Sequence, residues 1–417
     1  MVSNGDKLQE FLQNRNWTQY IRLQWIDFSG ILRTRFVPRD RCLEIAKGNE
    51  EYLLPQVSMI IPVSKSPIPI ASDLEIWCLR PDWSSIRCCG FKENHASVMC
   101  FLAHKEAEET YNKCPRMLLS RGLQRLQTEW DTKVLAGFEI EVMLLDQDCQ
   151  PLNDIDRLNS YQTTAGLRGK KLDIVEEILD SFKVSSINVH HFHTETHDQI
   201  EFALSPEPLL DAVDSLILAQ ETIRTIFVRH NIKATMTPKP SLKGQQMEFT
   251  FTCVLTHMNP LCAFGMANFD SYVRTTTGAA GKWAGYGTEN RDLPVRKITE
   301  QHWEFRMTDG TSNPYLFAGA VLLAGICGLS QKLTLAWEDC HVFPHSLDEG
   351  GRAKYGLDKR MPSSLREALD SLKTDNSIKS WIPKDMLNSY IAVKEKDAEA
   401  FQKMTDDQRR LRFLEFF

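Results

Sequence analysis

The stretch 301–316, QHWEFRMTDGTSNPYL, decides how the rest of the chain is interpreted. Its first half alternates, so a strand here carries charged or polar side chains on one face and apolar ones on the other. The polar face is His302, Glu304 and Arg306, and the apolar face is Trp303, Phe305 and Met307. A turn-rich run follows, and Asn313-Pro314 opens a long apolar helix over 315–329. A polar strand face that leads into a buried helix indicates that the charged residues face a cavity.

Composition limits the class of protein. The chain has 417 residues, with 42% apolar, 25% charged and a net charge of −6, which is typical of a globular enzyme of two or three domains. It is not basic enough to favour nucleic acid as a partner. No signal peptide or membrane span is expected, and eleven irregularly spaced cysteines predict free thiols and no structural metal. We therefore expect a soluble, cytoplasmic protein.

The first ~105 residues read as a small β-rich domain. Its expected elements are a hairpin at 20–36, a helix at 39–47, a proline-rich extended loop at 54–70, and strands at 74–79 and 96–102.

The remainder reads as a second domain. It is expected to begin with an amphipathic helix at 115–130 and a strand at 134–145, followed by helix–strand units at 171–204 and 207–256. The glycine-rich loop 278–292 is placed to close over a ligand. Beyond 315 we expect helices, the last at 391–416.

Three further stretches repeat the polar strand face, namely AGFEIEVMLL (136–145), DQIEFAL (198–204) and GQQMEFTFT (244–252). In the last, Gln246, Glu248 and Thr250 are predicted to face one way, and Met247, Phe249 and Phe251 the other. For any single strand a solvated polar face is the more probable interpretation. Together, clustered glutamates suit hard ions, Mg²⁺ or Mn²⁺. Arginines in the same half of the chain favour a site for Mg²⁺ and a polyphosphate; no P-loop or GxGxxG motif is present.

The order of these motifs resembles the glutamine synthetase family, within its fungal and bacterial glutamine-synthetase-like branch. The matching stretches are IRLQWIDFSGILRTR (21–35), GFEIE (137–141), FHTETHDQIEFALSP (192–206), ATMTPKP (234–240), NFDSYVR (268–274), YGTENRDLPVRKI (286–298) and HWEFRMTDGTSNPYL (302–316). The resemblance implies an α+β fold with a β-grasp domain at 1–108 and a catalytic domain at 109–417. In that domain an antiparallel sheet forms an open funnel with helices outside. It also implies ring-shaped homo-oligomers with active sites between subunits.

The resemblance implies a reaction in which ATP phosphorylates the γ-carboxylate of glutamate and an amine displaces the phosphate. Carried across by position, the family's roles give two metal sites. One is Glu141, Glu195 and Glu201, and the other is Glu139 and Glu304. The resemblance also implies that Arg274, Arg306 and the backbone of Gly244 bind the acid, and that Arg291 and Arg296 bind phosphate. Arg291, Glu304 and Arg306 are the candidate catalytic residues. The match at Glu195 requires a one-residue gap.

The chain also departs from the family. Glu248 stands where the second metal's histidine is expected, and Thr250 where a histidine contacts ATP. The acidic residues of the ammonium site have no match. These departures favour a Mg²⁺- and ATP-dependent ligase that joins glutamate or a similar acid to an amine other than ammonia. A catalytically weakened scaffold or signalling relative, and an ordinary glutamine synthetase, are the alternatives.

Overall fold

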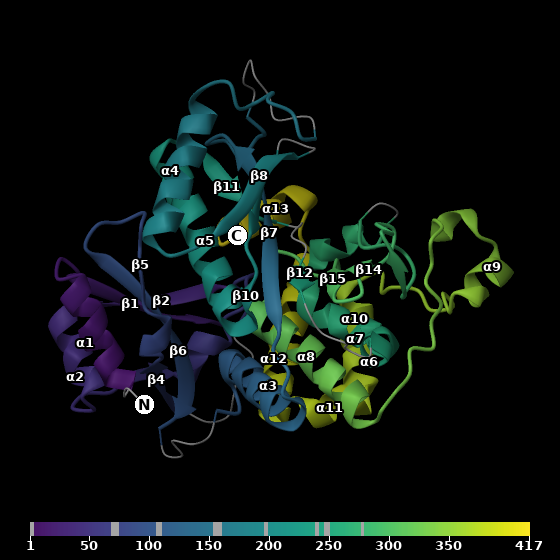
Figure 1. The fold of residues 1–417 in the computed structure, drawn as a ribbon, viewed down its shortest axis with the longest axis horizontal. Coiled ribbons are helices and arrows are strands. Elements are labelled where there is room, and N and C mark those ends of the chain that lie inside the picture. The colour runs from purple at the N-terminus through teal and green to yellow at the C-terminus, as the bar shows by residue number, and fades with distance from the viewer. Residues whose placement is uncertain are drawn as a thin grey trace.

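The computed structural model describes residues 4–67, 75–105, 111–152, 161–195, 199–237, 242–245, 251–276 and 279–417. Figure 1 shows two parts side by side, with the N-terminal part on the left and the larger remainder on the right. The α-helices are α1 (Asn4–Asn14), α2 (Arg39–Ala46), α3 (Pro115–Trp130), α4 (Lys170–Val184), α5 (Leu209–Arg229), α6 (Phe251–Thr256), α7 (Met258–Gly265), α8 (Pro314–Ser330), α9 (Glu349–Lys354), α10 (Leu365–Thr374), α11 (Asn376–Trp381), α12 (Lys384–Phe401) and α13 (Asp406–Leu414). The strands are β1 (Tyr20–Ile26), β2 (Leu32–Pro38), β3 (Tyr52–Pro55), β4 (Ile76–Pro81), β5 (Arg87–Cys88), β6 (His95–His104), β7 (Leu135–Leu145), β8 (Val189–Glu195), β9 (Gln199–Leu204), β10 (Glu207–Pro208), β11 (Lys233–Thr235), β12 (Leu242–Gln245), β13 (Tyr286–Thr288), β14 (Val295–Thr299) and β15 (His302–Phe305). Short 3₁₀ turns are η1 (Gln56–Met59), η2 (Trp83–Ser85), η3 (Phe269–Arg274) and η4 (Pro344–Ser346).

The N-terminal part is a six-stranded sheet in the order β2-β1-β6-β4-β3, with β5 paired to β6. The predicted hairpin is confirmed, since β1 and β2 pair antiparallel from Tyr20–Pro38 to Ile26–Leu32. Strand β1 is parallel to β6, and the sheet's remaining pairs are antiparallel. Apolar side chains of α1 and β1, such as Leu8 and Leu23, are fully buried in the core. The hydrophobic alternation seen in the sequence therefore produced this sheet.

The larger part is built on a nine-stranded curled sheet in the order β13-β14-β15-β12-β7-β9-β8, with β10 and β11 also on β7. All pairs are antiparallel except β13 with β14. Helix α5 packs on the apolar face of β7, and α4 packs on α5. Helix α8 is apolar on all sides and lies among other helices, with α3, α6 and α7 against it. The expected α+β fold is confirmed.

The turn of the N-terminal hairpin meets the turn that precedes α8. Gly30 has a φ of +89°, and a Cβ there would lie 2.4 Å from the carbonyl oxygen of Thr311. Asn313 caps α8 by accepting from the Leu316 N–H, and its amide group donates to the Asp27 carbonyl at 3.0 Å. The first sheet is thereby fixed beside the end of the stretch 301–316. The domain boundary at 108/109 stays a prediction.

Three local expectations were wrong. Strand β15 has only four residues, so Arg306 and Met307, which were expected on the strand, lie beyond its end. Phe251, expected on a strand, begins α6. The single helix 391–416 is instead α12 and α13, because Thr405 and Gln408 form a capping box that starts a new helix.

Other expectations concern the whole chain. All eleven cysteines are free thiols, as predicted. Within the described ranges, no helix is both long and apolar enough to cross a bilayer.

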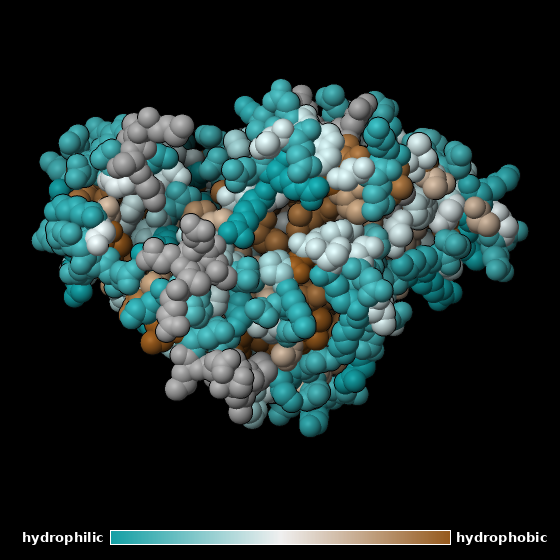
Figure 2. Space-filling model, turned by 90° about the horizontal axis from the view of Figure 1, so that it is seen from below, coloured by the Kyte–Doolittle hydropathy of each residue, from teal (hydrophilic) through white to brown (hydrophobic). Residues whose placement is uncertain are grey.

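Seen from below, apolar residues gather in the middle of the surface, with hydrophilic residues on either flank (Figure 2).

Candidate active site

Glutamates from three strands share one face of the curled sheet. Glu141 of β7 lies directly opposite Glu201 of β9 in the antiparallel ladder, and Glu139 lies two residues away on the same face. Position 243 of β12 is opposite both Gly137 and Glu304, which places Glu304 on that face too. Glu139 and Glu201 are each 7% exposed and Glu304 is 2% exposed. Carboxylates that share one largely buried sheet face are stabilised by cations beside them.

Two arginines hold Glu304. Arg296 of β14 lies opposite it in the ladder, and its Nη1 donates to one carboxylate oxygen at 2.8 Å. Arg306 Nη1 donates to the other oxygen at 2.7 Å. Arg296 also donates to Glu289, and these pairs raise the pKa of Arg296 although its burial acts to lower it. The sequence predicted Glu304 as a metal ligand; the structure places it as the shared counter-ion of two guanidinium groups.

Arg274 is the most deeply embedded cation of the site. It ends η3, is 6% exposed, and donates to the backbone carbonyls of Thr308 and Arg306 at 2.8 and 3.4 Å. Burial lowers its pKa, while Asp309, Glu141 and Glu304 act to raise it, so Arg274 lies within electrostatic reach of both groups of glutamates. Its buried Nε has no hydrogen-bond partner among the described residues. A free buried N–H on a guanidinium is suited to an anionic ligand.

The register of β8 against β9 places His193, which the sequence did not predict as a site residue, beside the glutamates. His193 lies opposite Glu201, with Nε2 3.6 Å from the carboxylate oxygen, whereas Glu195 lies two pairs further along, opposite Gln199. The position opposite Glu201 on β8 is therefore held by an imidazole, and Glu141 is opposite Glu201 on β7. A signal was available in the alternating HHFHTE of 190–195, but its register depends on the length of the following turn. The metal role of Glu195 stays a prediction.

The remaining predicted site residues do not all lie beside the glutamates. Gly244 lies in β12 between Trp303 of β15 and Ala136 of β7, in the centre of the sheet. Arg291 is exposed in the turn between β13 and β14. Glu248 and Thr250 lie outside the described residues, as does Gln246. The structure thus brings together Glu139, Glu141, Glu201, Glu304, Arg274, Arg296 and Arg306.

The site's residues fit a hard divalent cation and an anion together. Carboxylate oxygens on one sheet face are the ligand type that Mg²⁺ and Mn²⁺ prefer. The arginines beside them suit phosphate or carboxylate oxygens. This is the donor set that nucleotide-dependent phosphoryl transfer uses.

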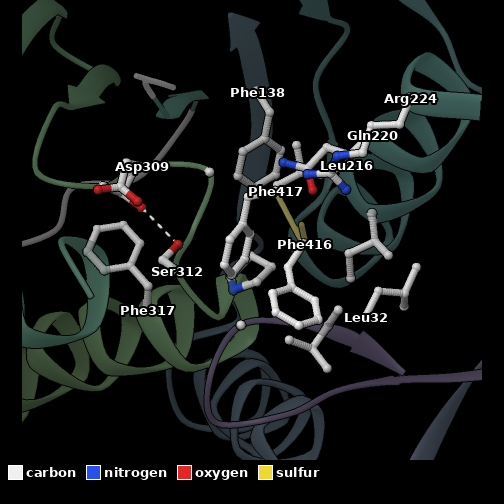
Figure 3. A pocket seen from close by; sticks show the side chains of 16 residues that line it. Leu32, Phe138, Leu216, Gln220, Arg224, Asp309, Ser312, Phe317, Phe416 and Phe417 are labelled. Atoms are coloured by element: carbon white, nitrogen blue, oxygen red, sulfur yellow. Dashed lines mark hydrogen bonds between the residues drawn. The ribbon is translucent and has the colours of Figure 1, made fainter. Parts of the chain in front are cut away.

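A separate pocket lies on the opposite, apolar face of β7. It is lined by Phe138 and by Leu216, Gln220 and Arg224 of α5, and Figure 3 shows Phe417 in its centre beside Phe138. The backbone oxygen of Phe417 accepts from the Met236 N–H and from the Thr235 hydroxyl, both at 3.0 Å. Because neighbouring residues of a strand point to opposite faces, this pocket is distinct from the glutamate site.

Comparison with known proteins agrees with this arrangement. The family model "Glutamine synthetase, catalytic domain" matches residues 112–249 and 243–413, so the chain belongs to the glutamine synthetase family. It is 29% identical to protein fluG of Emericella nidulans over 98% of this chain, spanning 50% of that protein's length. It is 23% identical to the glutamine synthetase of Methanocaldococcus jannaschii, over 99% of both chains. The resemblance to the glutamine synthetase family is confirmed.

Solved structures show the same fold. The complex of GmaS with ADP superimposes with a TM-score of 0.82 at 17% identity, covering 99% of both chains. The glutamine synthetase of Plasmodium falciparum gives 0.78 at 18% identity, covering 98% of both chains. Membership of this family supports an ATP-dependent C–N ligase in general terms.

Proposed function

We propose that this protein is an ATP- and Mg²⁺-dependent ligase that joins glutamate, or a similar acid, to an amine other than ammonia. One observation carries the proposal: Glu141 and Glu201 oppose each other on one sheet face, and Glu141 lies within electrostatic reach of the buried cation Arg274. A group of buried like charges lowers the stability of the folded state, so such a site is not explained by a structural role alone. Bound cations and a bound anion make it favourable.

The chemistry follows from the weakness of a free carboxylate as an acceptor for amines. Transfer of the γ-phosphoryl group of ATP to a carboxylate oxygen releases ADP and forms an acyl phosphate. The amine nitrogen then attacks the carbonyl carbon, the C–O bond to phosphate breaks, and inorganic phosphate and a proton leave. Arg274 and Arg306 are proposed to hold the acid, and Arg291 and Arg296 the phosphate. Mg²⁺ or Mn²⁺ on the glutamates would supply charge neutralisation.

The choice of amine rests on the sequence. Ammonia needs acidic residues that bind NH₄⁺ and take its proton, and the chain has no match for them. A larger amine brings binding energy of its own and depends less on such residues. As in the family, we propose a ring-shaped homo-oligomer with active sites between subunits.

A catalytically weakened scaffold is the second candidate. It is favoured by Glu304, because both of its carboxylate oxygens accept from arginines, at 2.8 and 2.7 Å, and a metal ion would have to compete with them. Ordinary glutamine synthesis remains the third candidate and differs from the first only in its amine.

The test is calorimetric titration of the purified chain with a non-hydrolysable ATP analogue, with and without Mg²⁺. Mg²⁺-dependent binding is expected, followed by phosphate release from ATP, glutamate and a panel of amines that includes ammonia. Arg274→Gln is expected to raise the KM for the acid with little change in nucleotide affinity. Arg125→Gln is the matched control, because Arg125 is exposed on α3 and pairs with Glu129. Absence of nucleotide binding in both conditions would leave the scaffold candidate.

A further inference from the structure

Histidines 191 and 193 stand beside Glu201 on the outer edge of the curled sheet. One ligand atom from each of these residues lies within 4.8 Å of the other two. The imidazole rings of His191 and His193 stack at 17°, with centroids 5.5 Å apart. His193 is directly opposite Glu201, and His191 is opposite Ala203, so the β8–β9 register itself brings the set together.

The hydrogen bonds of His193 prepare its ring for a metal ion. Nδ1 lies 3.1 Å from the carbonyl oxygen of Thr194, and since a carbonyl only accepts, Nδ1 carries the proton. The lone pair is then on Nε2, the atom that faces Glu201 at 3.6 Å. The rings of Tyr161 and His193 form a T-shaped pair with centroids 5.4 Å apart. A backbone carbonyl that fixes the tautomer is the usual support of a metal-binding histidine.

We propose that His191, His193 and Glu201 bind a divalent first-row transition-metal ion, such as Zn²⁺ or Co²⁺, in preference to Mg²⁺. Imidazole nitrogen suits such ions, whereas Mg²⁺ prefers oxygen and water. His193 Nε2 and the Glu201 carboxylate oxygen are 3.6 Å apart, which is close enough for both atoms to bind one ion through bonds of about 2.1 Å.

The consequence falls on the neighbouring carboxylates. An ion between His193 and Glu201 offsets the charge of Glu201, and the repulsion between Glu201 and Glu141 across the ladder is reduced. The inference deepens the proposed function because Glu201 belongs to both sites. The metal selectivity, however, comes from imidazoles that the family resemblance had not included.

The experiment uses the full chain after dialysis against a chelator, without nucleotide. Co²⁺ is added and its visible absorption bands are followed; Zn²⁺ and a large excess of Mg²⁺ are then added as competitors. We expect one tightly bound Co²⁺ per chain, displaced by Zn²⁺ and retained in Mg²⁺. His193→Ala, and separately the exposed His191→Ala, should weaken Co²⁺ binding by at least about tenfold.

His230→Ala is the control, because His230 is an exposed histidine paired with Glu177 at 2.7 Å, far along the chain from this site. It should leave Co²⁺ binding unchanged. Co²⁺ binding that is unaffected by both site variants, or displaced by Mg²⁺ as readily as by Zn²⁺, would overturn the proposal. The nucleotide titration is separate: a chain that binds Co²⁺ here but no Mg²⁺-nucleotide would refute the ligase and leave this metal site standing.

Discussion

Replacing Glu304 by glutamine is the sharpest test of how the site is held together. The side chain of Glu304 is 2% exposed, and those of its two partners, Arg296 and Arg306, are 11% and 13% exposed. Glutamine keeps the shape of the side chain but has only one acceptor oxygen. Its NH₂ group would therefore point its donors at the N–H donors of one of the two guanidinium groups. Removal of one member of a buried ionic group costs about 3–5 kcal/mol, and charge-assisted hydrogen bonds alone account for about 1.5–3 kcal/mol each. Arg296 retains Glu289, whose side chain is 55% exposed and therefore offsets little.

The assay is urea unfolding followed by tryptophan fluorescence at neutral pH. Glu304→Gln is expected to lower the free energy of unfolding by about 3–5 kcal/mol. The control is Glu300→Gln on the same hairpin, because Glu300 pairs with Lys297 at 2.6 Å but is 88% exposed. It should change stability by less than about 1 kcal/mol. Equal effects of the two variants would refute the view that Glu304 is the shared counter-ion.

This result also bears on activity measurements. For a residue that only binds metal or substrate, as the sequence predicts for Glu304, substitution by alanine should abolish activity and leave the fold intact. The structure changes that expectation, since the same carboxylate neutralises two arginines. The activity of a Glu304 variant is therefore informative only in the absence of denaturant and at an assay temperature well below the measured melting temperature of that variant.

Three further predictions concern stability. Burial raises the pKa of Asp27 to about 6. Between about pH 4 and 6 the Asp27 carboxyl is therefore protonated more in the folded than in the unfolded state. The free energy of unfolding should then fall as pH rises through that window, by up to about 1.4 kcal/mol per pH unit. In urea unfolding at a series of pH values, Asp27→Asn should lack this slope, and an unchanged slope would contradict the assignment. Arg116→Ala should cost about 3–5 kcal/mol, because Arg116 is 3% exposed and pairs with buried acids, whereas exposed Arg125→Ala should cost less than about 0.5 kcal/mol; equal chemical denaturation curves would refute it. Gly265→Ala should lower the melting temperature, since its Cβ would lie 2.1 Å from a backbone oxygen, while Gly169→Ala, with open space around it, should not.

Some features of this fold are local and could be predicted. The helix at 115–130 and the hairpin at 20–36 follow from apolar periodicity, proline and turn residues, which act within a few positions of the chain. The shared face of Glu139 and Glu141 is equally local, because side chains two apart on a strand point the same way. The family resemblance supplied the rest of the architecture.

Other features depended on parts of the chain that are far apart. The sequence predicted that the polar face of the stretch 301–307 looks into a cavity, but it did not predict how deeply that face is covered. Strand β15 lies between β14 and β12, and Trp303 and Glu304, on opposite faces, are both buried. Burial on the second face comes from packing that no local pattern records. The capping box at Thr405 was present in the sequence and was missed.

By itself, then, the amino-acid sequence determined the family, the alternation that places the glutamates on one strand face, and the presence of arginines for an anionic substrate. The tertiary structure alone decided which groups meet. It set Arg296 and Arg306 on Glu304, and it set His193 rather than Glu195 opposite Glu201. The physical reason is that strand parity is a property of a single segment, whereas register depends on the length of the turns and on the packing of a whole sheet.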